Sequence, residues 1–372
     1  MDVNTLAGRL RLWPGRAVPT IDSTRPDAAA RLAPGRRASE LPALLGALFT
    51  LCSHAHRFTA QRAVDAALGR PATVSADERR ALQAATARDQ VLRLTHDWPR
   101  QLPGARPAED AANVLRSCPL WRDDLAIAER LDALPAWIEH KWLGMAAQDW
   151  IAHWANNPLQ WPARWCSAAG GRIAPLLRAQ LERAQRLPTP AAPLGLLTDP
   201  QRSLPALACL MAGTPRFCAE PLWRGEAAET GPWTRHLDPV RPPAHNAWMR
   251  LVSRVVEVVR LALPGGEHWL SHGALTLGAH EGIAWTEMAR GLLVHWVQLE
   301  PVAEGARVAA CRVLAPTEWN FHPRGVLARA LAALPEGPQR DDDARCLAVA
   351  FDPCVEFEIV PATAPTPEAA HA

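Results

Sequence analysis

Apolar residues recur every three or four positions through most of the first 263 residues, which is the period of an amphipathic helix. Ser75-Ala76-Asp77-Glu78 has the form of a capping box, and Pro264-Gly265-Gly266 marks the end of the last helix in this series. The predicted helices lie at about 39–68, 75–94, 107–118, 124–132, 135–156, 172–186 and 245–263.

After Gly266 the pattern changes to short alternating segments separated by glycine-containing turns, which predicts antiparallel strands. Residues 8–13 alternate in the same way, so this N-terminal strand can add to the same sheet. A last helix is expected after Pro323, followed by a strand or short helix at 345–351. The four strands of the sheet are expected at 268–276, 281–286, 291–299 and 306–314.

These elements predict a mainly α fold with a small antiparallel β-sheet, of the α+β class. A chain of 372 residues, 48% of them apolar, can bury one large core. We expect a single domain over residues 1–360, in three parts. They are a helical body at about 39–263, a β-rich part at about 266–322 and a C-terminal segment at 323–360. The tail 361–372 is rich in Pro, Ala and Thr, which predicts disorder.

The charges nearly cancel, with 40 basic against 38 acidic residues. The chain therefore lacks the positive excess that is typical of nucleic-acid binding or of a basic membrane-binding surface. No stretch approaches the roughly 20 apolar residues of a membrane span, and the N-terminus lacks the apolar segment of a signal peptide. The sequence predicts a cytoplasmic protein without nucleic-acid or membrane partners.

Eight cysteines are present, and no two of them form a Cys-x-x-Cys pair. The irregular spacing and the length of the chain argue against a disulfide scaffold, so we expect reduced thiols. Cys52 lies one helical turn before His56, with His54 between them, and Cys354 ends the extended segment Asp352-Pro353-Cys354. Since one cysteine cannot close a metal chelate, each pattern alone favours a structural thiol.

Two further segments place polar groups at strand ends. Arg290 precedes a buried strand, where a guanidinium is costly unless it meets an anion. Pro316 and Thr317 follow the last strand of the sheet, where the threonine can present its hydroxyl and N–H. Taken singly, these segments are equally well explained as a hairpin-corner arginine and an ordinary turn.

The order of these segments, however, resembles the large subunit of nickel–iron hydrogenases. That family has an N-terminal Cys-x-x-Cys-Pro-x-x-His motif followed by Arg-Ala-Val, and Arg62-Ala63-Val64 sets the register here. Cys52 then falls on the second family cysteine and His56 on the family histidine, while Phe49 takes the place of the first cysteine.

The C-terminal motif of the family, Asp-Pro-Cys-x-x-Cys, resembles Asp352-Pro353-Cys354, with Phe357 in place of the last cysteine. Further similarities are Gly231–Arg235, Ala289–Trp296, Pro316–Asn320 and Gly8–Arg11, the last with Ala7 in place of a glutamate. The resemblance covers the whole chain, although 372 residues is short for the family. It implies a truncated hydrogenase-large-subunit-like fold.

In the family, four thiolates hold a nickel–iron centre. The resemblance makes Cys52 the equivalent of a bridging ligand and Cys354 the equivalent of a terminal nickel ligand. Nickel would lose two of its four thiolates, and the glutamate associated with proton transfer is absent at Ala7. The resemblance therefore implies a protein that is not an enzyme and holds no nickel.

The resemblance implies that the iron side of the centre is retained. In the family, the equivalents of Arg290, Pro316 and Thr317 surround the cyanide ligands of the iron, and soft thiolates suit an iron carbonyl–cyanide fragment. Phe49 and Phe357 are expected to make the vacated nickel side more apolar.

The chain thus resembles the hydrogenase accessory proteins of HupK/HoxV type. We expect a scaffold or chaperone that transiently holds an Fe(CN)2(CO) precursor through Cys52 and Cys354 and hands it to the hydrogenase large subunit. Its partners would be that subunit and small hydrogenase-maturation chaperones.

Two other functions compete with the scaffold. One is a metal-free interaction protein that mimics the large subunit, and the other is a redox enzyme, which the missing cysteines and glutamate disfavour. His54 and His56 are candidates for iron ligands, hydrogen-bond partners of a thiolate or packing residues. The other six cysteines are expected to be buried structural thiols.

Overall fold

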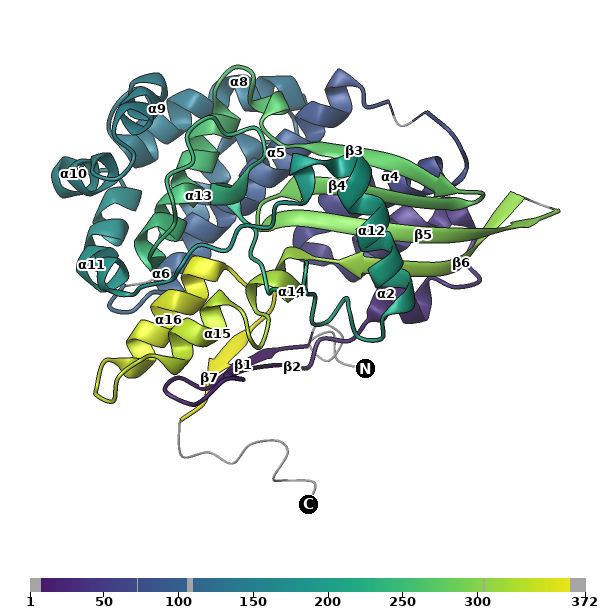
Figure 1. Cartoon of the computed structure of the whole chain (residues 1–372). Helices are drawn as coiled ribbons and strands as arrows, with labels where there is room; N and C mark the ends of the chain where they lie inside the picture. The colour runs from purple at the N-terminus through teal and green to yellow at the C-terminus, as the bar shows by residue number, and fades with distance from the viewer. Residues whose placement is uncertain (1–7, 72, 106–109, 304, 362–372) are drawn as a thin grey trace.

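The computed structural model describes residues 8–71, 73–105, 110–303 and 305–361, which form a helical body beside a layered sheet (Figure 1). The fold is the expected α+β fold with a small antiparallel sheet. Ala7 and most of the tail, 362–372, lie outside the described residues, so the predictions made for them are not addressed by the structure.

The larger sheet is the one predicted after Gly266. Its four strands are antiparallel neighbours in chain order, and β4 and β5 form a tight hairpin in which Met288 pairs with Gly291. This hairpin places Arg290 at the corner of the sheet that faces the helical body. The strands are β3 (His272–Gly278), β4 (Glu281–Met288), β5 (Gly291–Val302) and β6 (Gly305–Leu314).

Helices cover both faces of this sheet (Figure 1). On one face lie α3 (Leu41–Leu48) and α4 (Ser53–Ala67), and on the other lies α12 (Pro200–Gly213), which was not predicted. Helix α4 approaches β4 so closely that a Cβ at Gly282 would lie 2.4 Å from the Ala63 carbonyl oxygen. The glycine therefore fixes α4, and with it Cys52 directly before the helix, against the sheet.

The helical body is built around α13 (Ala247–Ala262). Every residue of this helix except Arg260 is buried, so α13 is covered all round and not on one broad face as predicted. The helices that pack against it are α5 (Ala76–Leu92), α8 (Ile127–Ile138), α9 (Ala147–Asn156), α11 (Ile173–Arg186) and α16 (Arg340–Phe351). The remaining described helices are α2 (Ala28–Leu32), α6 (Trp98–Gln101), α7 (Ala111–Ser117), α10 (Trp161–Ala168), α14 (Pro316–Asn320) and α15 (Val326–Ala332).

The N-terminal strand does not join the larger sheet, so that expectation is wrong. Strand β1 (Leu10–Leu12) pairs antiparallel with β2 (Ile21–Ser23) and parallel with β7 (Phe357–Ile359), forming a separate three-stranded sheet. Alternation predicts that a segment is a strand but carries no information about its partner. In Figure 1 this sheet lies below the larger one, beside α15 and α16.

Three helix predictions also need correction. The helix predicted at 39–68 is interrupted, because α3 ends at Leu48 and a short turn at Thr50–Cys52 precedes α4. The two helices predicted at 124–132 and 135–156 are divided at a different place. The first helical segment continues through Pro135 to Leu143 and ends at Gly144, which has a φ of +68°. The segment 345–351 is the second half of the 12-residue helix α16.

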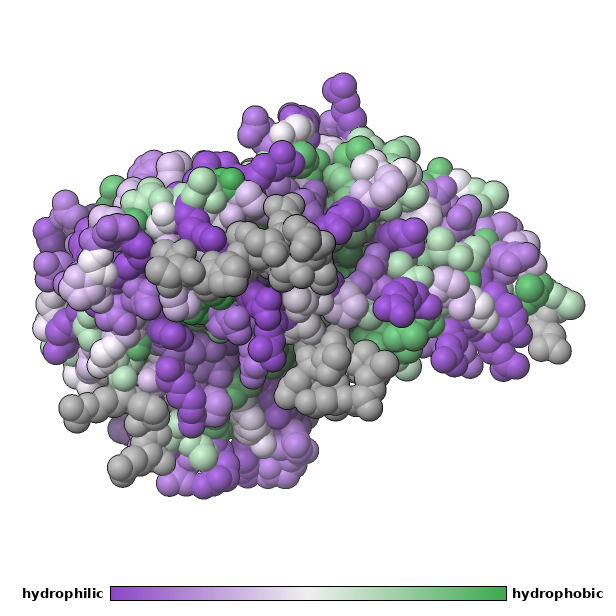
Figure 2. Space-filling view, turned by 90° about the horizontal axis from the view of Figure 1, so that it is seen from below, coloured by the Kyte–Doolittle hydropathy of each residue, from purple (hydrophilic) through white to green (hydrophobic). Residues whose placement is uncertain are grey.

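The surface is mostly polar. Figure 2 shows hydrophilic residues spread over the lower face, with apolar residues in small separate areas. None of the helices in the described ranges is both long and apolar enough to cross a membrane.

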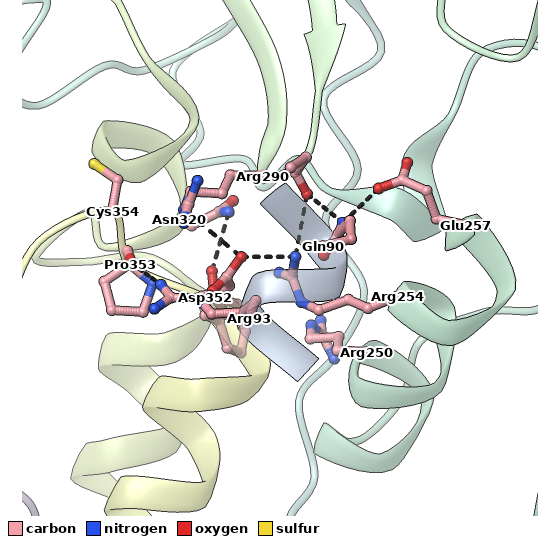
Figure 3. Close-up of polar contacts among 12 residues, drawn as sticks. Gln90, Arg93, Arg250, Arg254, Glu257, Arg290, Asn320, Asp352, Pro353 and Cys354 are labelled. Carbon is pink, nitrogen blue, oxygen red and sulfur yellow. Dashed lines mark hydrogen bonds and ion pairs between the residues drawn. The ribbon is translucent and has the colours of Figure 1, made fainter. Parts of the chain in front are cut away.

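One buried carboxylate joins the helical body to the C-terminal segment. Asp352 ends α16 in a left-handed conformation, with φ +55°, and is 2% exposed. Its carboxylate accepts a hydrogen bond from Arg93 Nε, lies 2.8 Å from Arg254 Nη1 and lies 3.7 Å from Arg290 Nε (Figure 3). Arg93 also donates to the carbonyl oxygen of Pro353, so the turn that leads to Cys354 is held on both sides.

The electrostatics of this cluster favour an ionised Asp352. Burial on its own raises the pKa of the carboxyl, but the charges of Arg254, Arg93 and Arg290 outweigh burial and hold the pKa below its usual value. Arg254 Nη1 donates to the carbonyl oxygen of Ala289 over 3.2 Å, which ties the β4–β5 corner to the same cluster.

Removing the charge of Asp352 should be strongly destabilising. Because Asp352→Asn leaves buried guanidinium groups without their carboxylate, we expect it to lower the free energy of unfolding by about 3–5 kcal/mol in urea titrations. The control is Asp341→Asn, an exposed carboxylate in the first turn of α16, which should cost less than about 1 kcal/mol. Equal losses in the two variants would show that the cluster does not stabilise the fold.

Candidate functional site

Cys354 is presented by the loop after α16, and its sulfur points away from the Asp352 carboxylate (Figure 3). Two side chains donate hydrogen bonds to Cys354 Sγ: Thr317 Oγ1 over 3.0 Å and Arg25 Nη1 over 2.5 Å. Thr317 Oγ1 also accepts from the Cys354 backbone N–H over 3.4 Å. A cationic donor and a hydroxyl therefore contact the same sulfur.

Thr317 and Pro316 lie in the first turn of α14, directly after β6, and both are buried. Proline suits this position because its fixed φ matches the helix and the missing N–H has no acceptor there. The predicted turn is therefore a short helix whose first residues face Cys354. The structure brings Thr317 and Cys354 together as the sequence analysis expected.

Arg25 is a residue of this site that the sequence analysis missed. It lies between β2 and α2, and its Nε pairs with Glu318 Oε1 over 2.9 Å, with the two side chains 12% and 15% exposed. Burial alone lowers the pKa of Arg25, but the charges of Cys354, Glu318 and Cys52 raise it above its usual value. No local pattern distinguishes Arg25 from its arginine-rich surroundings, since its partners are distant in the chain.

Cys52 lies at the start of α4 and is 7% exposed. Burial raises the pKa of its thiol, and the charge of Cys354 raises it further, while Arg290 and Arg25 act in the opposite direction. Electrostatic effects of this kind between two sulfurs require that they lie near each other. The two cysteines from opposite ends of the chain therefore lie near each other.

Arg290 lies in this site with part of its hydrogen-bonding capacity unused. It is 4% exposed, and among the described residues no acceptor bonds its Nε or Nη1. Burial lowers the pKa of the guanidinium, but the charges of Asp352, Asp89, Cys52 and Cys354 together raise it. A buried cation with unused donors is the feature expected where an anionic ligand group binds.

Backbone packing fixes the position of Arg290. Gly291 has a φ of +137°, and a Cβ there would lie 2.6 Å from Thr230 Cγ2. Only glycine is compatible with both the conformation and the contact. The Arg-Gly pair thus places the guanidinium at the sheet corner next to the cysteines.

A cavity of about 350 Å³ opens beside Cys52. Its polar lining includes His54, Arg88 and Asp89, and Leu51 is an exposed apolar residue of its wall. Burial raises the pKa of Asp89 to about 7, and Asp352 adds to the rise although Arg290 opposes it. A carboxyl that titrates near neutral pH therefore lies next to Cys52.

The two candidate histidines have different surroundings. His56 is buried, stacks on Phe49 with ring centroids 3.9 Å apart, and its Nδ1 lies 3.1 Å from His295 Nε2. His54 lines the cavity, and its Nε2 has no hydrogen-bond partner among the described residues. Burial lowers the pKa of both rings, so each is neutral at pH 7.

Phe49 and Phe357 differ in what they contact. Phe49 packs on His56, close to Cys52, whereas its place at a vacated ligand position stays a prediction. Phe357 lies in β7 opposite Leu10, with the Arg345 guanidinium 5.9 Å above its ring. Its role on the vacated side of the site stays a prediction.

The remaining cysteines are all unpaired, and four of the six are buried as expected. Cys209 is exposed and Cys218 is half-buried, so the expectation that all six are buried is wrong for these two. Cys209 lies on the outer side of α12, where the helix does not contact the sheet.

The donor set does not resemble a closed metal site. Within the ranges that the structure describes, no group of three or more His, Cys, Asp and Glu side chains is arranged to hold a metal ion. Two sulfurs, a threonine hydroxyl and two guanidinium groups would instead suit a metal fragment that brings further ligands of its own.

The raised pKa of Asp89 predicts a pH-dependent stability. Between about pH 4 and pH 7, folded Asp89 retains a proton that the unfolded chain has released, so the free energy of unfolding falls as pH rises through this window. Asp89→Asn should therefore stabilise the protein more at about pH 8 than at about pH 5 in urea titrations.

The control for this comparison is Asp77→Asn in the same helix, because the Asp77 side chain is 95% exposed. It should change stability equally at the two pH values. Equal effects of Asp89→Asn at both pH values would contradict the assigned pKa.

Comparisons with known proteins identify relatives of this chain. No known protein-family profile matches the sequence. The chain is 38% identical to the hydrogenase expression/formation protein HoxV of Cupriavidus necator, with 95% of each chain covered. It is 31% identical to the hydrogenase expression/formation protein HupK of Bradyrhizobium diazoefficiens, with 88% of each chain covered.

Solved structures of similar fold are hydrogenases. The nickel–iron–selenium hydrogenase of Desulfovibrio vulgaris Hildenborough matches with a TM-score of 0.53 and 15% identity, over 90% of this chain and 92% of that chain. The enzyme from Desulfomicrobium baculatum matches with a TM-score of 0.53 and 14% identity, over 91% and 94% of the two chains. These likenesses establish a hydrogenase-large-subunit-like fold, and the sequence identities show that the chain belongs to the HoxV/HupK family of hydrogenase expression/formation proteins.

Proposed function

We propose that this protein is a non-catalytic scaffold in nickel–iron hydrogenase maturation, which transiently holds an Fe(CN)2(CO) fragment for transfer to the hydrogenase large subunit. The observation that carries the proposal is the buried Arg290 guanidinium, whose Nε and Nη1 have no acceptor within the described residues and whose charge interacts with both Cys52 and Cys354. A cyanide nitrogen would supply the missing acceptor.

The sulfurs of Cys52 and Cys354 would bind the iron of this cargo, because soft thiolates suit an iron that carries carbonyl and cyanide ligands. Arg290 would donate to one cyanide. The Pro316-Thr317 turn lies at the Cys354 side, where the Thr317 hydroxyl already donates to the sulfur over 3.0 Å. These donors are fixed by the Asp352 cluster and the α14 helix, so they require no rearrangement to receive the fragment.

The same arrangement argues against hydrogen turnover. Phe49 stacks on His56 at the place where the large-subunit motif has a cysteine, so no thiolate is available there to complete a nickel site. This chain would offer two sulfurs, where the large-subunit motif has four. The fragment would therefore be bound less firmly here, which suits a protein that has to release it. The proposal includes the large subunit and small maturation chaperones as partners, and the cytoplasm as the place of action.

The histidines have supporting roles in this proposal. His56 is engaged by Phe49 and His295, so it is assigned to packing beside Cys52 and not to iron. His54 lines the cavity, and its buried Nε2 has no hydrogen-bond partner among the described residues, so its role stays open to a change of conformation when a partner group binds.

Infrared spectroscopy of the purified protein tests the cargo directly. Protein isolated from cells that carry the maturation machinery should show carbonyl and cyanide stretching bands and bound iron. Cys52→Ala and Cys354→Ala should each lose these bands, because one thiolate cannot hold the fragment alone. Cys209→Ala, which removes an exposed cysteine of α12, should retain them.

Hydrogenase maturation in the same cells provides the second readout. The Cys52→Ala and Cys354→Ala strains should lose most hydrogen-uptake activity, whereas the Cys209→Ala strain should keep it. Full activity in both alanine strains, with no infrared bands in the wild-type protein, would instead support a metal-free protein that mimics the large subunit.

A further inference from the structure

A cation of the protein itself occupies one side of Cys354. The Arg25 guanidinium donates to Cys354 Sγ from Nη1 over 2.5 Å, while Glu318 Oε1 pairs with Nε of the same guanidinium over 2.9 Å. Both side chains of the ion pair are largely buried, at 12% and 15% exposure. The guanidinium is therefore fixed in place at the sulfur, unlike a surface arginine that samples many positions.

The charge of Arg25 also reaches the second sulfur. Its interactions with Cys354 and with Cys52 both favour the protonated guanidinium, and its charge disfavours protonation of His56. Arg290 acts on the two sulfurs from the sheet corner. Two permanent positive charges thus act on the sulfurs, and of these two arginines Arg25 is the one that contacts Cys354 Sγ directly.

We infer that Arg25 is a specificity-determining residue, which keeps bare divalent metal ions away from Cys354 while admitting a metal fragment that has no net charge and carries anionic ligands. This inference rests on the proposed function for the identity of the admitted fragment. The exclusion of bare ions depends only on the positions of Arg25, Cys354 and Cys52.

The selectivity would arise from the short-range electrostatic interaction between the Arg25 guanidinium and whatever is bound to Cys354. A nickel or zinc ion bound to Cys354 would lie within a few ångströms of a fixed guanidinium in a site of low effective dielectric constant, where like charges repel strongly. Iron(II) with two cyanides and a carbonyl has no net charge, and its outer cyanide nitrogens accept hydrogen bonds from guanidinium groups. Glu318 reduces the repulsion of a bare ion, but it contacts Nε of Arg25, whereas the sulfur contacts Nη1.

Binding of the iron fragment alone would require neither the buried Arg25–Glu318 ion pair nor a second hydrogen-bond donor to Cys354 Sγ. A buried Arg25–Glu318 ion pair is costly to desolvate, and an apolar pair of similar size would pack as well. Thr317 already gives Cys354 Sγ one hydrogen bond, so a second, cationic donor is not needed to satisfy the sulfur. Protection of this half-buried sulfur against free metal ions would explain both the ion pair and the second donor.

Nickel binding to the metal-free, tag-free full-length protein tests the inference. We expect Arg25→Gln to bind Ni²⁺ at least about tenfold more tightly than wild type, because the fixed like charge is gone. The readouts are equilibrium dialysis and the thiolate-to-nickel charge-transfer absorption. Arg25→Lys keeps the charge and should stay close to wild type, and the gain should vanish in Arg25→Gln/Cys354→Ser.

Two further variants serve as controls, one for the unpaired carboxylate that Arg25→Gln leaves and one for the loss of any single arginine charge. Arg25→Gln/Glu318→Gln removes the whole ion pair, so no buried carboxylate is left unpaired; it should still bind Ni²⁺ more tightly than wild type, with a smaller gain than Arg25→Gln because the attraction of Glu318 is also gone. Arg122→Gln removes an arginine that pairs with Asp124 over 2.6 Å at the surface and should leave nickel affinity unchanged. Circular dichroism and thermal unfolding establish that each variant is folded.

Unchanged nickel affinity in folded Arg25→Gln and Arg25→Gln/Glu318→Gln would overturn the inference, as would a gain that survives Cys354→Ser. Because these measurements use nickel alone, without iron or partner proteins, they are independent of the infrared bands. Absence of those bands would therefore defeat the proposed function without deciding whether Arg25 excludes bare ions.

Discussion

The rest of the site depends on the buried carboxylate of Asp352. Arg93 from the turn after α5, Arg254 from α13 and Arg290 from the β4–β5 corner converge on it, so one negative charge joins two helices, the sheet and the C-terminal segment. Since breaking a buried ion pair leaves uncompensated charge in the interior, this junction strongly resists displacement. After Asp352 the chain continues through Pro353 to Cys354, which is two residues beyond the buried carboxylate.

The second sulfur is fixed by an unrelated contact. Helix α4 lies directly on the sheet at Gly282, and Cys52 precedes the first turn of that helix. The two cysteines therefore do not share a loop or a motif. Each is attached to a rigid part of the fold, and the site forms because the sheet and the helical body are packed together. Arg25 completes it from a third element, the connection after β2.

Local patterns in the sequence predicted a large part of this arrangement. The four strands of the larger sheet, the Ser75 capping box and the helix at 247–262 follow from periodicity and capping chemistry. The pairing of β1 with β7 and the contact between Arg25 and Cys354 could not be predicted, because both join segments separated by most of the chain. The interruption at Phe49 was also missed, since apolar residues continue through it with a helical period.

The central claim is that Cys52 and Cys354 bind the same iron. X-ray absorption at the iron K-edge of the purified, iron-loaded protein tests it most directly. The account predicts two sulfur neighbours per iron together with short iron–carbon distances in the wild type, and a single sulfur neighbour in any iron that Cys354→Ala retains. An iron without sulfur neighbours, or one whose sulfur shell is unchanged in Cys354→Ala, would contradict the account.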